Sequence, residues 1–202
     1  MLDKDGFNEW ASEYDSAVDK SREAGEYPFC GYDAVHALVY ETVQGCADII
    51  DFGVGTGRLT KRLYDGGANI VGVDFSENML AAAKAKMPNA TFICADLSKG
   101  MPDVDRKFDA AVMLYAIHHL TDEQKIALIN GAGEHIKAGG KFVIGDVAFA
   151  NESDRLFARQ SAGDKWDDDE YYCVYDKLKD RLGKKSTFKK ISFCAGVIII
   201  EF

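Results

Sequence analysis

Short apolar runs alternate with helical patterns through the middle of the chain. The runs fall at 47–52, 69–74, 91–96, 108–114 and 141–144, and each is typical of a buried strand. Helical patterns fill the gaps, over 58–64, from Ser76 to the residue before Pro88, and from the capping box Thr121-Asp122-Glu123-Gln124 to Gly139-Gly140. Regular strand–helix alternation predicts a parallel sheet with right-handed crossovers.

Both ends of the chain depart from that alternation. Helical patterns occupy 7–24 and 32–43, so we expect residues 1–45 to form a helical cap. After a helical stretch near 168–182, strand patterns at 189–194 and 196–202 follow so closely that they can pair only as a hairpin. One of these two strands should therefore run antiparallel to the rest.

Together these patterns predict an α/β fold with a doubly wound, Rossmann-like sheet of seven strands. The sheet should be mostly parallel, with a C-terminal antiparallel hairpin. With 202 residues, 47% of them hydrophobic, the chain can bury one substantial core. We therefore expect a single domain over 1–202, in which 46–202 form the Rossmann-like core.

Charge and composition narrow the functions that this fold could serve. The net charge is −9, whereas proteins that bind nucleic acids usually carry a basic field. The N-terminus is too polar for a signal peptide, and no apolar run approaches the ~20 residues that span a bilayer. The five cysteines are scattered without a close pair, as in reduced cytoplasmic chains. We expect a cytoplasmic protein with a small-molecule site, and neither nucleic acid nor membrane as a partner.

The strongest chemical signal is a glycine-rich turn between a strand and a helix, Asp51-Phe52-Gly53-Val54-Gly55-Thr56-Gly57. Glycine has no Cβ, so the backbone can turn tightly and approach a ligand closely. The free N–H groups at the start of the following helix suit an anionic group. The sequence therefore predicts a ligand site at this turn.

Two further carboxylates stand at strand ends. Asp74, 21 residues past Gly53, ends the second strand, where a carboxylate can accept both hydroxyls of a ribose. Asp96 ends the third strand, in reach of an adenine amino group. With Asp51 they border the crevice where open α/β sheets bind ligands. The alternative is that all three are only strand-ending turn residues.

A dinucleotide site is a second interpretation of the glycine turn. Its fingerprint is G-x-G-x-x-G, whereas Arg58 stands here where the third glycine would fall. A long side chain there would hinder the close approach of helix and strand that a dinucleotide needs. A nucleoside without a pyrophosphate is favoured, and an NAD-dependent oxidoreductase is the less favoured alternative.

At four places the sequence resembles the class I S-adenosylmethionine-dependent methyltransferases: 51–57, Asp74, Ala95-Asp96 and Tyr115-Ala116-Ile117-His118-His119-Leu120. Four segments are also similar to the YrrT-like methyltransferases of bacteria: Trp10-Ala11, Tyr14-Asp15, Gly31-Tyr32-Asp33 and 118–123. The resemblance covers nearly the whole chain. It implies five parallel strands plus a closing pair, and S-adenosylmethionine as the cofactor.

The resemblance assigns five residues to the methionine end of the cofactor. Gly53 and Gly55 would line the methionine moiety. Asp51 would steady the turn and help balance the ammonium group. Tyr115 would lie at the mouth near the sulfonium, and Tyr14 could close over the methionine tail. The alternative for Tyr14 is simple packing of its helix against the core.

The resemblance assigns five more residues to the adenosine end. Asp74 would grip the ribose, while Phe75 and Met79 would pack against the adenine. Asp96 would bond the adenine amine, with Leu97 beneath the ring.

Two consecutive histidines follow the fourth strand. Methyl transfer depends on alignment and the exclusion of water, so no catalytic residue is obligatory. Where a base is needed, we favour His118 for the pocket over His119, and the alternative is that both only support the loop. Adjacent histidines rarely converge on one ion and the sequence shows no partner cluster, so no metal is expected.

We expect a methyltransferase that acts on a small-molecule acceptor by in-line transfer. The acidic composition suits a small cationic or thiol-bearing metabolite. A non-catalytic S-adenosylmethionine-binding protein is the main alternative, because it would keep the same cofactor motifs. The sequence makes no prediction of the oligomeric state.

Overall fold

A mixed β-sheet is the middle layer of the computed structural model, which describes residues 14–23 and 25–202. Seven strands follow the order β3-β2-β1-β4-β5-β8-β7, and a two-residue strand, β6, pairs with β5. Their bounds are β1 Asp48–Phe52, β2 Asn69–Asp74, β3 Thr91–Cys94, β4 Phe108–Leu114, β5 Ile136–Phe149, β6 Cys173–Val174, β7 Ser186–Lys190 and β8 Ala195–Glu201. Strands β1 to β5 are parallel, and β8 is antiparallel to both β5 and β7. The predicted sheet, with its closing antiparallel hairpin, is confirmed.

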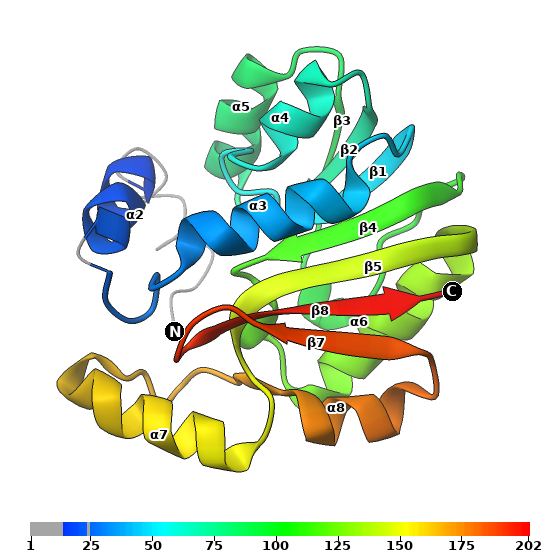
Figure 1. Ribbon diagram of the computed structural model, residues 1–202. Coiled ribbons are helices and arrows are strands. Elements are labelled where there is room, and N and C mark those ends of the chain that lie inside the picture. Colours follow the sequence, from blue (N-terminus) through cyan, green and yellow to red (C-terminus); the bar gives the residue numbers. More distant parts are fainter. Residues whose placement is uncertain (1–13, 24) are drawn as a thin grey trace.

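Helices cover both faces of this sheet (Figure 1). Their bounds are α2 Tyr14–Glu23, α3 Tyr32–Val43, α4 Thr60–Asp65, α5 Glu77–Lys86, α6 Asp122–His135, α7 Glu152–Ala162 and α8 Tyr175–Leu182. Within the described residues, three short 3₁₀ turns connect other elements: η1 Leu97–Lys99, η2 Ile117–His119 and η3 Gly163–Lys165. Helices α3, α4 and α5 pack in one apolar cluster with the sheet, while α6 and α8 pack in another.

Along the strands, successive side chains belong alternately to the two apolar clusters. Ile49 and Val143 pack on the face that α3 covers, and Ile50 and Ile144 pack on the face that α6 covers. Successive side chains of a strand point to opposite faces, so a strand covered on both sides needs a continuous apolar run. This explains why the strands lack polar alternation.

Helix α3 is part of this core, because Val35, Val39 and Val43 pack among the strands. A Cβ on Gly145 of β5 would lie only 2.5 Å from a methyl group of Val35. The glycine thus lets α3 approach the sheet closely. The expected helix over 7–24 is described only from Tyr14 to Glu23; Trp10 and the side chain of Tyr14 lie outside the described residues.

The end of α6 and the start of β5 differ from the prediction. Helix α6 ends at His135 and β5 begins at once, since Ile136 pairs with Phe108 before the register shifts by a bulge. Gly139 and Gly140 therefore lie in an irregular strand, and the prediction that they end the helix was wrong.

The sequence did not predict α7, which Asn151 caps by accepting from the N–H of Asp154 at 3.0 Å.

The helical pattern near 168–182 is confirmed only for its second half, because α8 begins at Tyr175. The hairpin strands begin a little earlier than predicted, at Ser186 and Ala195. None of the helices in the described ranges combines the length and apolar character needed to cross a membrane.

Candidate active site

A cavity of about 260 Å³ opens at the carboxyl ends of the parallel strands, and we call it the main cavity because the predicted site residues line it. Its wall contains many of the residues singled out in the sequence: Gly53, Gly55, Asp74, Phe75, Met79, Asp96, Leu97 and Tyr115. The carboxyl ends of β1, β2, β3 and β4 lie side by side, so turns far apart in the sequence meet here. This is the edge at which open α/β sheets bind ligands.

The glycine turn reaches the cavity because its backbone has no side chain in the way. Gly53 has φ +72°, and a Cβ there would lie 2.6 Å from the Cβ of Ala116. The N–H groups of Gly53 and Val54 both donate to the carbonyl of Val73, at 2.8 and 3.0 Å. These bonds tie the end of β1 to β2 and hold the turn beside the cavity.

Asp74 organises the same turn through its carboxylate. One oxygen accepts from the N–H of Gly55 and the other from the N–H of Ser76, both at 2.9 Å. The residue is 6% exposed. Burial raises the pKa of Asp74, and the backbone donors only partly offset that rise. The carboxylate thus has a fixed orientation at the end of β2.

Asp51 lies behind the turn and not on the wall of the main cavity. It is almost fully buried and accepts a hydrogen bond from the hydroxyl of Thr60. Burial raises its pKa to about 7; the Thr60 hydrogen bond opposes this shift, and the nearby Asp74 carboxylate adds to it. Asp51 lines a smaller hollow of about 40 Å³, which shares Gly53, Gly55 and Tyr115 with the main cavity.

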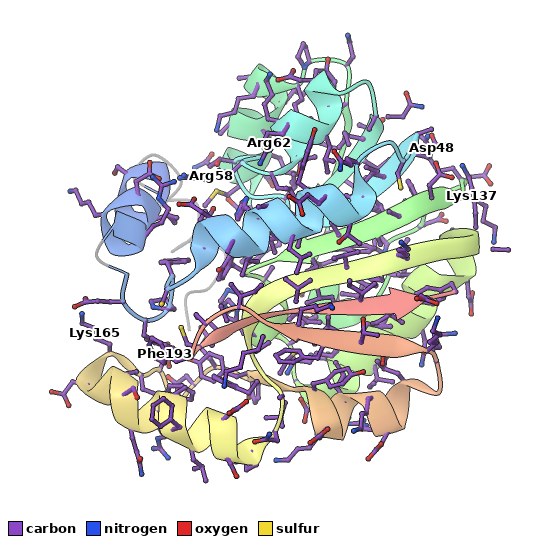
Figure 2. All side chains as sticks on the ribbon, in the orientation of Figure 1. Asp48, Arg58, Arg62, Lys137, Lys165 and Phe193 are labelled. Carbon is purple, nitrogen blue, oxygen red and sulfur yellow. The ribbon has the colours of Figure 1, made fainter. Side chains whose placement is uncertain are left out.

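Arg58 also lines the smaller hollow, and its guanidinium extends toward α2 (Figure 2). It forms an ion pair of 2.6 Å with Asp19 of that helix and lies 5.6 Å from the ring centre of Tyr32. The side chain therefore links the turn after β1 to the N-terminal helices.

Asp96 and Leu97 line the main cavity on the side away from the glycine turn. Asp96 caps η1 by accepting from the N–H of Ser98 at 3.0 Å. That serine lowers the pKa of Asp96 through its hydrogen bonds, and Lys99 contributes to the same shift. Asp96 is therefore ionised near neutral pH. The apolar side chains of Leu97, Phe75 and Met79 form the adjoining wall.

Tyr115 holds an unusual backbone conformation. Its φ of +48° is the one positive value among the non-glycine residues that the structure describes. Its ring stacks on Tyr32 with centres 5.1 Å apart and contacts Phe29 edge-on at 5.4 Å. Such strain persists where the surroundings fix it and is common at functional sites.

The structure places the two histidines differently from expectation. His119, and not His118, is on the wall of the main cavity. His118 is drawn away because its Nδ1 lies 2.6 Å from Oδ1 of Asp146, a fully buried residue of β5. Burial would lower the pKa of His118, but the carboxylates of Asp146 and Glu170 raise it above its usual value.

Two acidic residues at this end were missed from the sequence. Asp146 follows an apolar strand run, so the rule that found Asp74 would have found it. Glu170, whose Oε2 lies 3.1 Å from Nδ1 of His119, stands in a polar connection before β6. Nothing local in the sequence marks Glu170, since only the fold brings it to the histidines.

Known proteins with similar sequences identify the family. Residues 49–140 match a family model described as a methyltransferase domain. The chain is 33% identical to an uncharacterized methyltransferase of Oceanobacillus iheyensis, over 96% of this chain and 94% of that protein. The chain belongs to this methyltransferase family. The methyltransferase is also 32% identical to the uncharacterized methyltransferase YrrT of Bacillus subtilis, over 86% of its own length and 78% of that of YrrT.

The fold of the methyltransferase is shared with solved structures. A structure of DhpI in complex with SAH superposes with a TM-score of 0.73, covering 96% of this chain and 92% of DhpI at 17% identity. The resemblance to class I S-adenosylmethionine-dependent methyltransferases is thus confirmed for family and fold. The dinucleotide interpretation is not supported, because the relatives are methyltransferases.

Proposed function

We propose that this methyltransferase transfers a methyl group from S-adenosylmethionine to a small-molecule acceptor at the main cavity. The observation that carries this proposal is the convergence of Gly53, Asp74 and Asp96 on one hollow of about 260 Å³. These residues come from three separate strand ends, and each offers what one part of the cofactor needs.

The adenosine end of the proposed site fits by chemistry. Asp74 is oriented by two backbone donors, and its carboxylate would accept the ribose hydroxyls. Phe75, Met79 and Leu97 supply an apolar wall for the adenine ring, and Asp96 would accept from its amino group.

The methionine end is proposed at the junction of the two hollows. Gly53 and Gly55 would line the methionine chain, and Tyr115 would lie near the sulfonium. Asp51 lines the smaller hollow, where its carboxylate would balance the ammonium group. Closure by Tyr14, at the first residue of α2, stays a prediction.

When bound, S-adenosylmethionine supplies an electrophilic methyl group. The residues of this chain would orient the donor and exclude water, an effect that can reach ~10⁵–10⁸ M in effective molarity. His118 stays our candidate for a base: Asp146 orients its Nδ1 and leaves Nε2 to accept a proton. His119 is a second candidate, because it lies on the cavity wall.

The setting of the protein is part of the proposal. The five cysteines are free thiols, which suits the reducing cytoplasm. The net charge of −9 favours a small neutral or cationic acceptor over a nucleic acid. We also propose that residues 1–202 act as one domain, with 1–45 as a helical cap and 46–202 as the Rossmann-like core.

Transfer of a labelled methyl group to a panel of amines, alcohols and thiols tests the proposed function. We expect transfer to at least one acceptor by the wild type, and much slower transfer by Asp74→Ala. Binding of S-adenosylmethionine without transfer to any acceptor would favour a non-catalytic binding protein.

A further inference from the structure

Three side chains beside the main cavity gather around one point. They are His118 and His119 of η2 and Glu170 of the connection before β6. One potential ligand atom from each lies within 4.8 Å of the other two. Oε2 of Glu170 is 3.1 Å from Nδ1 of His119 and 3.9 Å from Nε2 of His118.

Consecutive histidines can face one point here because they use different ring atoms. His118 turns Nδ1 toward Asp146, so its Nε2 is directed at Glu170. His119 presents Nδ1 to the same carboxylate oxygen. The sequence-based expectation of no metal assumed that neighbouring rings diverge, and this arrangement removes that objection.

Asp146 fixes the orientation of the His118 ring through Nδ1. Asp146 is fully buried and also accepts from the N–H groups of Ile117 at 3.1 Å and Val147 at 2.6 Å. A histidine that binds a metal usually donates its other N–H to a carboxylate, which fixes the tautomer and the ring. The pair of Asp146 and His118 has this arrangement.

Glu170 is held in place by its neighbour. The N–H of Tyr171 donates to the carbonyl of His118 at 2.8 Å, and the carbonyl of Tyr171 accepts from the buried ammonium of Lys125. The side chain of Glu170 is 10% exposed. Its Oε2 is buried and receives no hydrogen bond from the described residues. A buried carboxylate oxygen without a donor is costly unless a cation satisfies it.

We propose that His118, His119 and Glu170 bind a divalent transition-metal ion, with Zn²⁺ as the best fit. Two histidines and one carboxylate are a donor set of zinc sites that keep an open position. Metal–ligand bonds of ~2.0–2.2 Å place ligand atoms about 3.3 Å apart in a tetrahedron. The separations of 3.1 and 3.9 Å lie close to that value. The charges also suit a cation, since Glu170 and Asp146 face the cluster and the ammonium of Lys125 is paired with Asp122 at 3.0 Å.

An ion at this position would adjoin the main cavity, because His119 forms part of the cavity wall. Its open position would suit an acceptor thiolate or oxygen. An ion bound to Nε2 of His118 would replace the role of that nitrogen as a base and leave His119 or the ion itself to act on the acceptor. This consequence rests on the proposed function, whereas metal binding itself does not.

Titration of the metal-stripped protein with Co²⁺ tests the site, followed by competition with Zn²⁺. We expect visible absorption bands typical of tetrahedral cobalt, at one ion per chain, and their loss on adding Zn²⁺. Glu170→Gln and His119→Ala should lose the bands, and Asp146→Asn should weaken binding by roughly 10–100-fold. Circular dichroism would establish that each variant is folded.

His135→Ala is the matched control, because this histidine lies outside the cluster with its Nδ1 3.3 Å from the carbonyl of Arg106. It should bind cobalt as the wild type does. Wild-type protein without the bands, or Glu170→Gln with unchanged affinity, would overturn the proposal. Calorimetry with S-adenosylhomocysteine in the presence of a chelator tests the cofactor site separately, so the two proposals can fail independently.

Discussion

At the scale of single residues, the carboxylate of Asp74 has a structural role and a proposed role in binding. It holds the glycine turn through Gly55 and Ser76, and we propose that it accepts the ribose hydroxyls. Replacing Asp74 with alanine removes hydrogen bonds to a charged group, each worth ~1.5–3 kcal/mol. We therefore expect Asp74→Ala to weaken S-adenosylhomocysteine binding by about 10²–10⁴-fold, measured by calorimetry. The exposed Asp65, paired with Lys61, supplies the control Asp65→Ala. Equal affinities for both variants would contradict the ribose role.

Asp51 makes the stability of the ligand-free protein depend on pH. Burial raises its pKa to about 7 in the folded state, so the folded protein keeps a proton that the unfolded chain releases near pH 4. Stability from this group is thus present at low pH and is lost as pH rises through about 7. Urea unfolding at pH 5.5 and 7.5 should show a steeper loss for the wild type than for Asp51→Asn, by up to ~1.4 kcal/mol per pH unit. Parallel curves for the two proteins would refute the shift.

The sequence was a good guide to residues whose role is local. Gly53 and Asp74 were found because a turn without side chains and a carboxylate at a strand end leave their marks within a few positions. The preference for His118 over His119 on the cavity wall was wrong for the opposite reason. The direction of its ring depends on Asp146, which lies 28 positions away.

At the scale of elements, the turn from β1 to α4 depends on close approach as well as on backbone freedom. Gly53 and Gly139 both have positive φ, but only at Gly53 would a Cβ meet another atom, that of Ala116 at 2.6 Å. Alanine at either site pays ~1–2 kcal/mol for the left-handed backbone. Gly53→Ala should therefore be less stable than Gly139→Ala in urea unfolding, and it alone should bind S-adenosylhomocysteine poorly. Equal losses would show that the contact with Ala116 is unimportant.

Elements were predictable where the sequence carries its own boundary signal. The predicted start of α5 at Ser76, which caps the helix, and the predicted capping box of α6 at Thr121 are confirmed. The end of α6 was not predictable, because pairing of Ile136 with Phe108 overrides the glycines that follow. Helix α7 was missed although Asn151 caps its start, and its larger apolar residues, Leu156 and Phe157, are exposed.

At the scale of the whole molecule, cofactor binding should stabilise the folded state. A ligand at 100 times its Kd adds ~2.7 kcal/mol, which for a chain of this size raises Tm by about 5–10 °C. Thermal unfolding should show this shift with S-adenosylhomocysteine and none with NAD at the same concentration. A shift with NAD alone would contradict the assigned cofactor.

The fold as a whole was predictable because strand and helix periods, the hairpin signal and chain length all pointed to one topology. The cluster of His118, His119 and Glu170 was not predictable. Its members lie on η2 and on a polar connection about 50 residues later, and no periodicity relates the two.

The amino ends of the parallel strands form the rim of the sheet opposite the main cavity, and Asp48 and Lys137 lie together there (Figure 2). Lys137 bridges Asp48 at 2.9 Å and Asp109 at 2.8 Å, and this pairing holds the pKa of both carboxyl groups below their usual range. The proposed active site lies at the other rim. A linker attached at the Asp48–Lys137 rim would therefore fix the protein to a solid support with the proposed active site facing the solution.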